Sequence, residues 1–477
     1  MKKLQILLLF LIIIGGIIFR LYRSNGPVAD WHSWRQADTS AVSRNFVNLG
    51  FDLLHPRFDD LSNVASGLDN PEGYRFVEFP IYNAFQAGLF VAFNNLTLEQ
   101  WGRIVSIFAS VLTILLLFLI VKRHSSTLSA IIASFFFAFL PFSVYYGRTI
   151  LPDQLMVTSS LMGILFFDLA VEKKSNFKPI LFFILSLIFT TSAFLLKPYA
   201  IFFALPIVYL AFSRFKFTAF KKWYLWLYLI ISVLPLILWR NFMSNYPQGI
   251  PASDWLFNGG NIRFSGAFFY WLFADRIGRL MLGFWGLSLF ALGFLKKLQK
   301  KEFLFFISFF LSSLIYLFVI ARGNVQHDYY QILIVPTIAI YLGLGGSFLL
   351  SYKGVSKIIT WIMFTVITLF CLSFSWYFVR DYFNIVNGSI VKAGEAVDKM
   401  LPKDAKVIAS YNGDTSFLYQ TKRKGWASME KPLPEMINMG AQYLILVNPT
   451  QADINLGKEY KIVTLNKDFV IFDLLKK

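Results

Sequence analysis

Long apolar runs recur along the first 380 residues, separated by short polar segments. A helix that crosses a bilayer needs about 20 mostly apolar residues. Eleven runs approach that length: residues 4–22, 104–121, 128–145, 154–171, 180–196, 199–212, 224–239, 280–295, 303–320, 332–350 and 358–379. The pattern predicts a polytopic α-helical membrane protein with about eleven transmembrane helices.

Two apolar runs need a separate interpretation. The run at 79–93 carries Pro80, Asn83 and Gln86, so we expect a helix that lies in the membrane interface without crossing. The first run follows Met1-Lys2-Lys3 and is followed by Arg20 and Arg23. It lacks the small-residue cleavage site of a signal peptide, and we interpret it as a retained membrane helix.

Basic residues predict the orientation, because lysine and arginine gather in cytoplasmic loops. They cluster at every second junction between the predicted spans: Lys2/Lys3, Lys122/Arg123, Lys173/Lys174/Lys178, Arg214/Lys216/Lys221/Lys222, Lys296/Lys297/Lys300/Lys301 and Lys353/Lys357. We therefore expect a multi-pass protein of the cytoplasmic (inner) membrane, with its N-terminus inside and its C-terminus outside. The long first outer loop would be 23–101.

From about residue 391 the composition becomes that of a soluble domain. We expect strands at 405–411, 441–447, 460–465 and 469–474, and short helices at 416–420 and 433–439. The prediction is a membrane domain over 1–390 and a small extracytoplasmic α/β domain over 391–477. That domain either caps a site or binds acceptor, or it only assists folding.

Composition narrows the chemistry. The chain is 56% hydrophobic and only 15% charged, which is more apolar than a soluble protein of this size can bury. Its net charge of +18 is explained by the inner loops, and we expect no nucleic-acid partner. Cys371 is the single cysteine, so an internal disulfide and a cysteine-based metal cluster are excluded.

The stretch 30–39 concentrates ionisable and aromatic residues in a chain that is poor in charge. Ser33 and Gln36 have the spacing of a capping box, which predicts a helix from Trp34 that ends near Gly50. Asp38 would lie inside this helix, close to the outer membrane surface. It is a candidate general base; the alternative is a simple ion pair with Arg35.

Three further segments place polar side chains on the predicted outer side. Asp153 follows Pro152 at a helix start, near Arg148 and Tyr146. It either serves a site or only complements the helix dipole. Lys197 stands between two apolar runs, where it either meets a phosphate or snorkels to the interface. The segment at 326–330 adds His327, Asp328 and Tyr330, beside Tyr329.

Glu78 is the last outer-side candidate. It shares the first outer loop with His32 and His55, and these residue types can bind a divalent metal ion. A divalent metal is the only cofactor that the residues suggest.

Together these groups suit a reaction on a lipid-borne phosphate. A base would take the proton of an acceptor hydroxyl, which attacks an anomeric carbon while polyprenyl phosphate leaves. A phosphate leaving group needs positive charge but no general acid. Lys197, Arg148 and Arg35 could supply that charge.

These motifs resemble bacterial members of glycosyltransferase family 39, which includes protein O-mannosyltransferases and the aminoarabinose transferases of lipid A. The resemblance rests on His32-x-Trp34-Arg35-Gln36-Ala37-Asp38-Thr39, Glu78-Phe79-Pro80, Arg148 with Pro152-Asp153, Lys197-Pro198 and His327-Asp328-Tyr329-Tyr330. It implies a GT-C fold, a polyprenyl-phosphate sugar donor and an outward-facing site. It also implies a catalytic acidic residue in the first outer loop, assisted by Asp153.

The sequence departs from the family pattern at three places. The adjacent Asp-Glu pair of the first loop is missing, so Asp38 takes that role here, with His32 and Asp30 as rivals. Phe79 stands where the aminoarabinose transferases have a lysine. Glu78 matches a metal-binding glutamate of those enzymes, but residues 240–279 contain no histidine.

The leading hypothesis is a hexosyl or pentosyl transferase that acts on a lipid, glycan or protein acceptor. A lipid-linked sugar transporter or flippase is the alternative, although such proteins usually show repeated halves and polar residues at midspan. A third hypothesis is that the membrane part is only a scaffold that displays the C-terminal domain.

Overall fold

A computed structural model describes residues 3–172 and 178–476. The predicted basic positions Lys2, Lys173 and Lys174 lie outside the described residues. By packing, the chain forms two compact units. We call Met1–Ser24, Ile104–Trp239 and Ser253–Asp381 the helical unit. We call Asn25–Arg103, Arg240–Ala252 and Tyr382–Lys477 the mixed unit.

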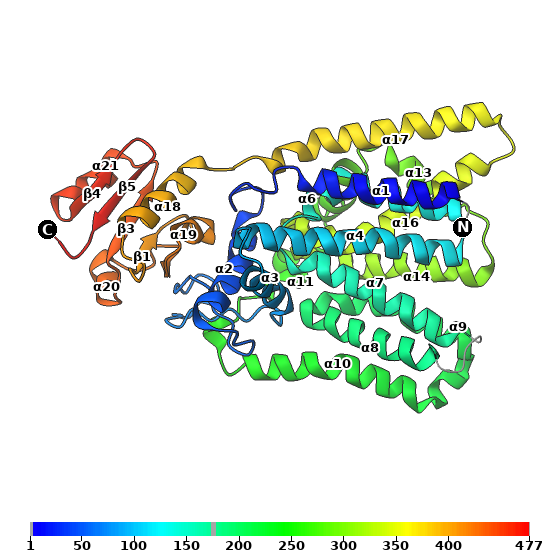
Figure 1. The fold of residues 1–477 in the computed structure, drawn as a ribbon, viewed down its shortest axis with the longest axis horizontal. Coiled ribbons are helices and arrows are strands. Elements are labelled where there is room, and N and C mark those ends of the chain that lie inside the picture. The colour runs from blue at the N-terminus through cyan, green and yellow to red at the C-terminus, as the bar shows by residue number, and fades with distance from the viewer. Residues whose placement is uncertain (1–2, 173–177, 477) are drawn as a thin grey trace. The chain divides into compact units, whose positions relative to one another are not determined.

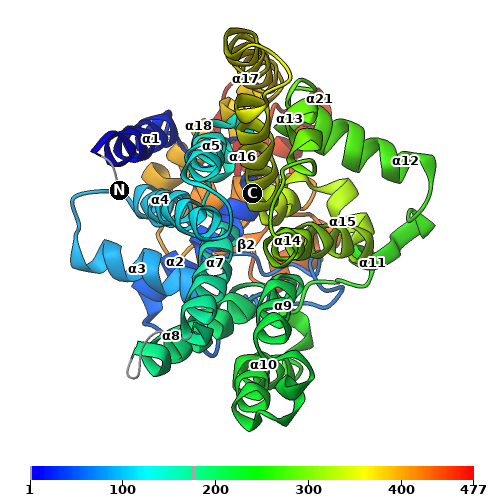
Figure 2. The ribbon, with the colours of Figure 1, turned by 90° about the vertical axis from the view of Figure 1, so that its right-hand side faces the viewer.

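Long apolar helices dominate the chain (Figures 1 and 2). In the described residues, nine segments are long and apolar enough to cross a membrane. They are built on α1 (Lys3–Leu21), α4 (Leu98–His124), α7 (Pro152–Val171), α8 (Lys178–Leu196), α9 (Ala204–Phe215), α10 (Trp223–Met243), α14 (Lys300–Val319), α16 (Val335–Ser351) and α17 (Lys357–Val379). The protein is thus a multi-pass membrane protein, as its apolar runs predict.

The other two predicted spans are interrupted helices, which is why nine continuous spans replace the expected eleven. The run at 128–145 forms α5 (Thr127–Phe139) and α6 (Pro141–Tyr146), with a break at Leu140. A residue before proline disfavours helical geometry. The run at 280–295 forms only α13 (Gly286–Gly293), after a π-helical segment, η5 (Tyr270–Met281). Gly283 between them has a positive φ of 50°.

Arg20 of α1 stabilises the break between α5 and α6. Its guanidinium is fully buried and donates hydrogen bonds to the carbonyls of Phe137 and Ala138, at 3.1 and 2.9 Å, and to Ser143 Oγ at 3.0 Å. The break leaves the last carbonyls of α5 without helical partners. Arg20 therefore acts as a cap supplied by another helix.

Glycines let α16 pack closely between α5 and α13. A Cβ at Gly343 would lie 2.5 Å from the Ser129 carbonyl oxygen, and one at Gly345 would lie 1.8 Å from that of Leu289. Small residues are how membrane helices bring their backbones together. This explains the Gly-Leu-Gly-Gly run within an otherwise bulky apolar segment.

The helical unit also contains shorter helical turns. They are η1 (Pro198–Phe203), η2 (Lys216–Lys221), α11 (Trp255–Asn258), η4 (Gly259–Asn261), α12 (Gly266–Phe269), α15 (Ala321–Gln326) and η6 (Asp328–Ile334). Another turn, η7 (Arg380–Phe383), leads into the mixed unit.

The mixed unit is built on a five-stranded sheet of order β2-β1-β3-β5-β4. Its strands are β1 (Val407–Ala409), β2 (Gly425–Trp426), β3 (Tyr443–Val447), β4 (Lys461–Leu465) and β5 (Phe469–Asp473). β1 is parallel to β2 and β3, with Val407 opposite Tyr443, whereas β5 is antiparallel to β3 and β4. The four predicted strands are confirmed, while β2 was not predicted.

Helices complete the mixed unit: α2 (Ser33–Leu49), α3 (Ile81–Ala92), η3 (Pro247–Gly249), α18 (Gly388–Met400), α19 (Thr415–Thr421), α20 (Leu433–Asn438), α21 (Gln451–Ile454) and η8 (Asn455–Lys458). With 12 residues, α3 is about 18 Å long, too short to cross a bilayer. Its polar positions face protein, since Asn83 donates to the Thr39 carbonyl and Gln86 accepts from Ser43 Oγ.

The first outer loop joins the edge of the sheet. The Leu61 amide donates to the Gly425 carbonyl at 2.7 Å, and the Gly425 amide donates to Asp59 O at 3.0 Å. Leu61 is buried in the same core cluster as Ile408 and Trp426. The C-terminal domain therefore packs as one body with the loop of residues 25–103.

Candidate active site

The acidic stretch of the sequence lies at the start of α2. His32 is the N-cap, in the left-handed region with φ 54°, and Gly50, with φ 98°, ends the helix as predicted. The predicted capping box is wrong, because α2 begins at Ser33 and the N-cap makes no side-chain hydrogen bond. Gln36 donates instead to Asp30 Oδ1 at 2.7 Å. Asp30 is therefore fixed against the first turn of α2.

Two buried ion pairs connect α2 with the segment that leads into α3. Arg35 Nη2 lies 2.7 and 2.8 Å from the two oxygens of Glu78, and Arg75 Nη2 lies 2.5 Å from Asp38 Oδ2. The alternative that Arg35 pairs with Asp38 is wrong, since Arg75 takes that place. A cavity of about 10 Å³ lies among these four side chains, room for about one water molecule.

The second oxygen of Asp38 is bound by the C-terminal domain. Thr415 Oγ1 donates to Asp38 Oδ1 at 2.7 Å and lies 3.2 Å from the Trp34 carbonyl. Asp38 is 2% exposed. Arg75 and Thr415 were not predicted from the sequence, because neither is near Asp38 in the chain or belongs to a recognisable motif.

Two further carboxyl groups interact electrostatically with Asp38. Burial raises the pKa of Asp60 to about 6, and the charge of Asp38 adds to this effect. Burial also raises the pKa of Asp414, again assisted by Asp38 and opposed by His32. The surroundings of Asp38 are thus rich in acidic groups as well as in arginine.

In the helical unit the structure brings Asp153 and Lys197 together. Lys197 Nζ lies 3.4 Å from Asp153 Oδ2, and both side chains are 6% exposed. The ammonium also lies 5.9 Å from the ring centroids of Tyr329 and Tyr330. Lys197 is therefore held inside the protein, and the snorkelling alternative is wrong.

A second pair joins two other predicted site residues. Tyr146 donates its hydroxyl hydrogen bond to Asp328 Oδ1 at 2.6 Å, and both residues are buried. Arg148 lies 5.2 Å over the Tyr145 ring, and its Nη1 donates to the Arg23 carbonyl at 3.4 Å. The end of α6 and the segment at 326–330 thus meet through the hydrogen bond between Tyr146 and Asp328.

The aromatic side chains at 327–330 form a stack. The His327 ring lies 5.6 Å from that of Tyr329 and 6.2 Å from that of Tyr330, with interplanar angles of 26° and 21°. Tyr330 is anchored through its carbonyl, which accepts a hydrogen bond from the Tyr316 hydroxyl at 3.1 Å. We call these three rings the tyrosine wall; those of Tyr329 and Tyr330 lie beside the Lys197 ammonium.

The described residues contain no group of three or more His, Cys, Asp or Glu side chains that could hold a metal ion. Both oxygens of Glu78 accept from Arg35. His55 interacts with Asp52 and with the Tyr246 hydroxyl, at 2.9 and 3.1 Å. The observed donor set does not fit a metal centre at Glu78.

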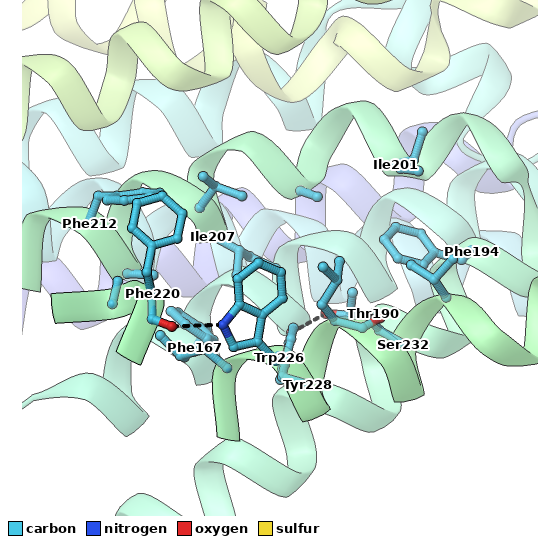
Figure 3. A pocket seen from close by; sticks show the side chains of 17 residues that line it. Phe167, Thr190, Phe194, Ile201, Ile207, Phe212, Phe220, Trp226, Tyr228 and Ser232 are labelled. Carbon is cyan, nitrogen blue, oxygen red and sulfur yellow. Dashed lines mark hydrogen bonds between the residues drawn. The ribbon is translucent and has the colours of Figure 1, made fainter. Parts of the chain in front are cut away.

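An apolar cavity of about 210 Å³ lies in the helical unit among α7, α8, α9 and α10 (Figure 3). Phe167, Phe194 and Ile207 contribute to its wall. Its polar groups are satisfied: Trp226 Nε1 donates to the Phe220 carbonyl at 2.9 Å, and the Tyr228 hydroxyl lies 2.7 Å from Thr190 Oγ1. Such a cavity suits hydrocarbon and excludes charged groups.

Residues 78–239 match the family model described as dolichyl-phosphate-mannose-protein mannosyltransferase. No curated protein matches the chain. Among solved structures, ArnT from Cupriavidus metallidurans, in the apo state and bound to undecaprenyl phosphate, is 11% identical, with TM-scores of 0.66 and 0.65 and 97% coverage of both chains. The apo oligosaccharyltransferase of Archaeoglobus fulgidus is also 11% identical, with a TM-score of 0.61, and the match covers 94% of this chain and 70% of that one.

These similarities confirm two expectations. The resemblance to glycosyltransferase family 39 is confirmed by the family match, which includes Glu78, Arg148, Asp153 and Lys197. The GT-C fold, with its small C-terminal sheet domain, is confirmed by the structural likeness.

Proposed function

From this resemblance we propose that the chain is a membrane glycosyltransferase. It would transfer a hexosyl or pentosyl group from a polyprenyl-phosphate donor to a hydroxyl of a lipid, glycan or protein acceptor. The observation that carries the proposal is the buried pair of Asp153 and Lys197 beside the tyrosine wall. It lies within the stretch that matches the mannosyltransferase family.

Lys197 and Arg148 would hold the donor phosphate, with Tyr146 as a further contact. At 3.4 Å the contact between Lys197 and Asp153 is long for a charge-assisted hydrogen bond, so the ammonium can turn to an incoming phosphate at small cost. A phosphate that gains charge as the anomeric bond breaks is stabilised by such a cation in a site with little water. Asp153 and Asp328 would then orient the cation and the tyrosine.

The acceptor hydroxyl would be bound by the acidic stretch of α2. In the transfer, the acceptor oxygen attacks the anomeric carbon, its proton passes to a carboxylate, and the bond from that carbon to the phosphate oxygen breaks. Asp38 is our candidate for the proton acceptor or for the group that positions the acceptor. Because both of its oxygens are engaged, positioning is the better fit, and Asp30 and His32 are the rival bases.

The lipid part of the donor would lie among the membrane helices. One solved relative by fold, ArnT, is bound to undecaprenyl phosphate. Here the apolar cavity among α7 to α10, with a volume of about 210 Å³, has room for a short stretch of hydrocarbon chain. Its wall offers only satisfied polar groups, as a hydrocarbon chain requires.

The distribution of lysine and arginine along the sequence supports an outward-facing site, with the C-terminal domain on the same side. Glu78, His327 and Tyr330 would complete the site without contacting the reacting atoms, Glu78 by holding Arg35 and the two aromatic residues by forming the wall. Membrane lipids would surround the nine apolar segments.

A reconstituted assay tests the proposal. Purified protein in proteoliposomes receives a radiolabelled polyprenyl-phosphate sugar, and both acceptor labelling and donor movement across the bilayer are measured. We expect label on an acceptor. Donor movement without product would instead favour the lipid-linked sugar transporter or flippase. Mass spectrometry of glycans and lipids from a deletion strain would identify the sugar and its acceptor.

A further inference from the structure

The N-terminus of α19 presents a hydroxyl to the acidic helix. Asp414 caps α19 by accepting from the Ser416 amide at 2.8 Å, which fixes the backbone on both sides of Thr415. Thr415 is the first residue of the helix, and its Oγ1 lies 2.7 Å from Asp38 Oδ1. A hydroxyl donor therefore sits on one oxygen of Asp38 while Arg75 occupies the other.

Arg75 is itself held in place. Its guanidinium lies 5.0 Å over the Phe58 ring and is mostly buried. A carboxylate that accepts hydrogen bonds from a charged donor on one oxygen and from a hydroxyl on the other is held with its plane in one orientation. Its remaining lone pairs consequently point in fixed directions.

The contact between α19 and α2 does not depend on Asp38. Arg44 of α2 lies 4.1 Å over the Tyr419 ring and donates to the Tyr419 carbonyl at 3.2 Å. The same guanidinium pairs with Asp59, and the Tyr419 hydroxyl pairs with Glu99. This network stabilises the junction about one helical turn away from Thr415.

We infer that Thr415 and Arg75 are positioning residues that orient the Asp38 carboxylate toward the acceptor, an inference that rests on the proposed function. Within the mixed unit, the C-terminal domain thereby helps to set the orientation of Asp38 and is more than a folding appendage. If these side chains only stabilised the fold, apolar residues of similar volume would do so at least as well, because burying an ion pair costs free energy.

The test compares isosteric variants of the full-length protein. Thr415→Val removes the hydroxyl and keeps the shape, Thr415→Ser keeps the hydroxyl, and Thr464→Val makes the same change on β4. We expect Thr415→Val to lower kcat/KM for the acceptor roughly tenfold to a hundredfold, as misplacement of a catalytic group does. The KM for the donor should stay the same. Thr415→Ser should regain most of the activity, and Thr464→Val should match the wild type.

A wild-type value for Thr415→Val, or equal losses in the valine and serine variants, would overturn the inference while leaving the proposed function intact. Absence of transfer by the wild type would instead count against the proposed function. Melting temperatures of Asp38→Asn, Thr415→Val and the double variant form a separate test that needs no activity. Additive shifts would show that the two side chains are uncoupled and would refute the inference.

Discussion

Lys197 and Asp153 form a buried pair across the helical unit, 3.4 Å apart, although each stands at the start of a different helical segment. Each residue alone has an ordinary explanation, as an interface anchor or as a helix-dipole partner. Together they place opposite charges away from water, which is costly unless function retains it.

Asp153→Asn is expected to abolish transfer while the protein still inserts and folds. The amide keeps the shape of the side chain but leaves Lys197 without its counter-charge, so the cation is no longer oriented for the phosphate. Donor binding and product formation should be measured separately in proteoliposomes. Asp168→Asn, on the same helix, is the matched control for α7. Wild-type turnover in purified Asp153→Asn would remove the assignment.

Three side chains compete for the role of base, and single substitutions separate them. If Asp38 positions the acceptor, Asp38→Asn raises the acceptor KM and lowers kcat. If Asp30 or His32 accepts the proton, Asp30→Asn or His32→Gln removes general-base catalysis and lowers kcat by at least about a hundredfold. The measurement is the initial rate as a function of acceptor concentration at saturating donor, which gives kcat and the acceptor KM. Glu99→Gln, in the Arg44 network, reports any general damage to the mixed unit.

Arg20→Met is expected to destabilise the helical unit. Its guanidinium binds carbonyls that the break at Leu140 leaves without helical partners, and each buried polar group left unsatisfied costs about 1–3 kcal/mol. We expect a lower apparent melting temperature in detergent. Arg214→Met changes an exposed arginine on α9 and should leave the apparent melting temperature almost unaltered. Equal shifts in the two variants would contradict the capping role.

Asp60 predicts a pH dependence of stability in the mixed unit. Its pKa of about 6 lies above its usual 3.8 because of burial, so the folded state binds the proton more tightly than the unfolded state. The contribution of Asp60 to stability is therefore greatest below about pH 4 and falls as the pH rises through 6, by at most about 3 kcal/mol. Melting temperatures of wild type and Asp60→Asn should converge or cross over this range. If the two plots of melting temperature against pH ran parallel, the raised pKa of Asp60 would be refuted.

Filling the apolar cavity tests the lipid path. Ala211→Phe adds a ring to the wall formed by α9. We expect a higher KM for a long-chain donor and an unchanged KM for a donor analogue with one or two isoprene units. Phe303→Leu on the exposed face of α14 serves as the control. The same KM change for both donor lengths would show that the cavity does not hold the chain.

The sequence predicts the parts of this fold that depend on local composition. Apolar runs locate the membrane helices, and alternation locates four of the five strands. The distribution of basic residues also predicts that Lys197, Asp153, Tyr146 and Asp328 share the outer side, but the sequence did not predict which of them pair. The features that were not predicted depend on long-range packing. The two-residue strand β2 is too short to show a pattern. The role of Thr415 is visible only from its contact with α2, almost 380 positions earlier in the chain. Ser33 and Gln36 had the right spacing for a cap, but Asp30 offered Gln36 a better acceptor.

The edge formed by Leu61 and Gly425 has a consequence for biosynthesis. Leu61 leaves the ribosome about 360 residues before its β-sheet partner Gly425, on the order of tens of seconds earlier at ordinary elongation rates. During this interval the loop must avoid aggregation and proteolysis without its native neighbour. A nonsense mutation before residue 425 would therefore leave the loop of residues 25–103 permanently without this sheet edge, and the truncated product should be cleared rather than accumulate.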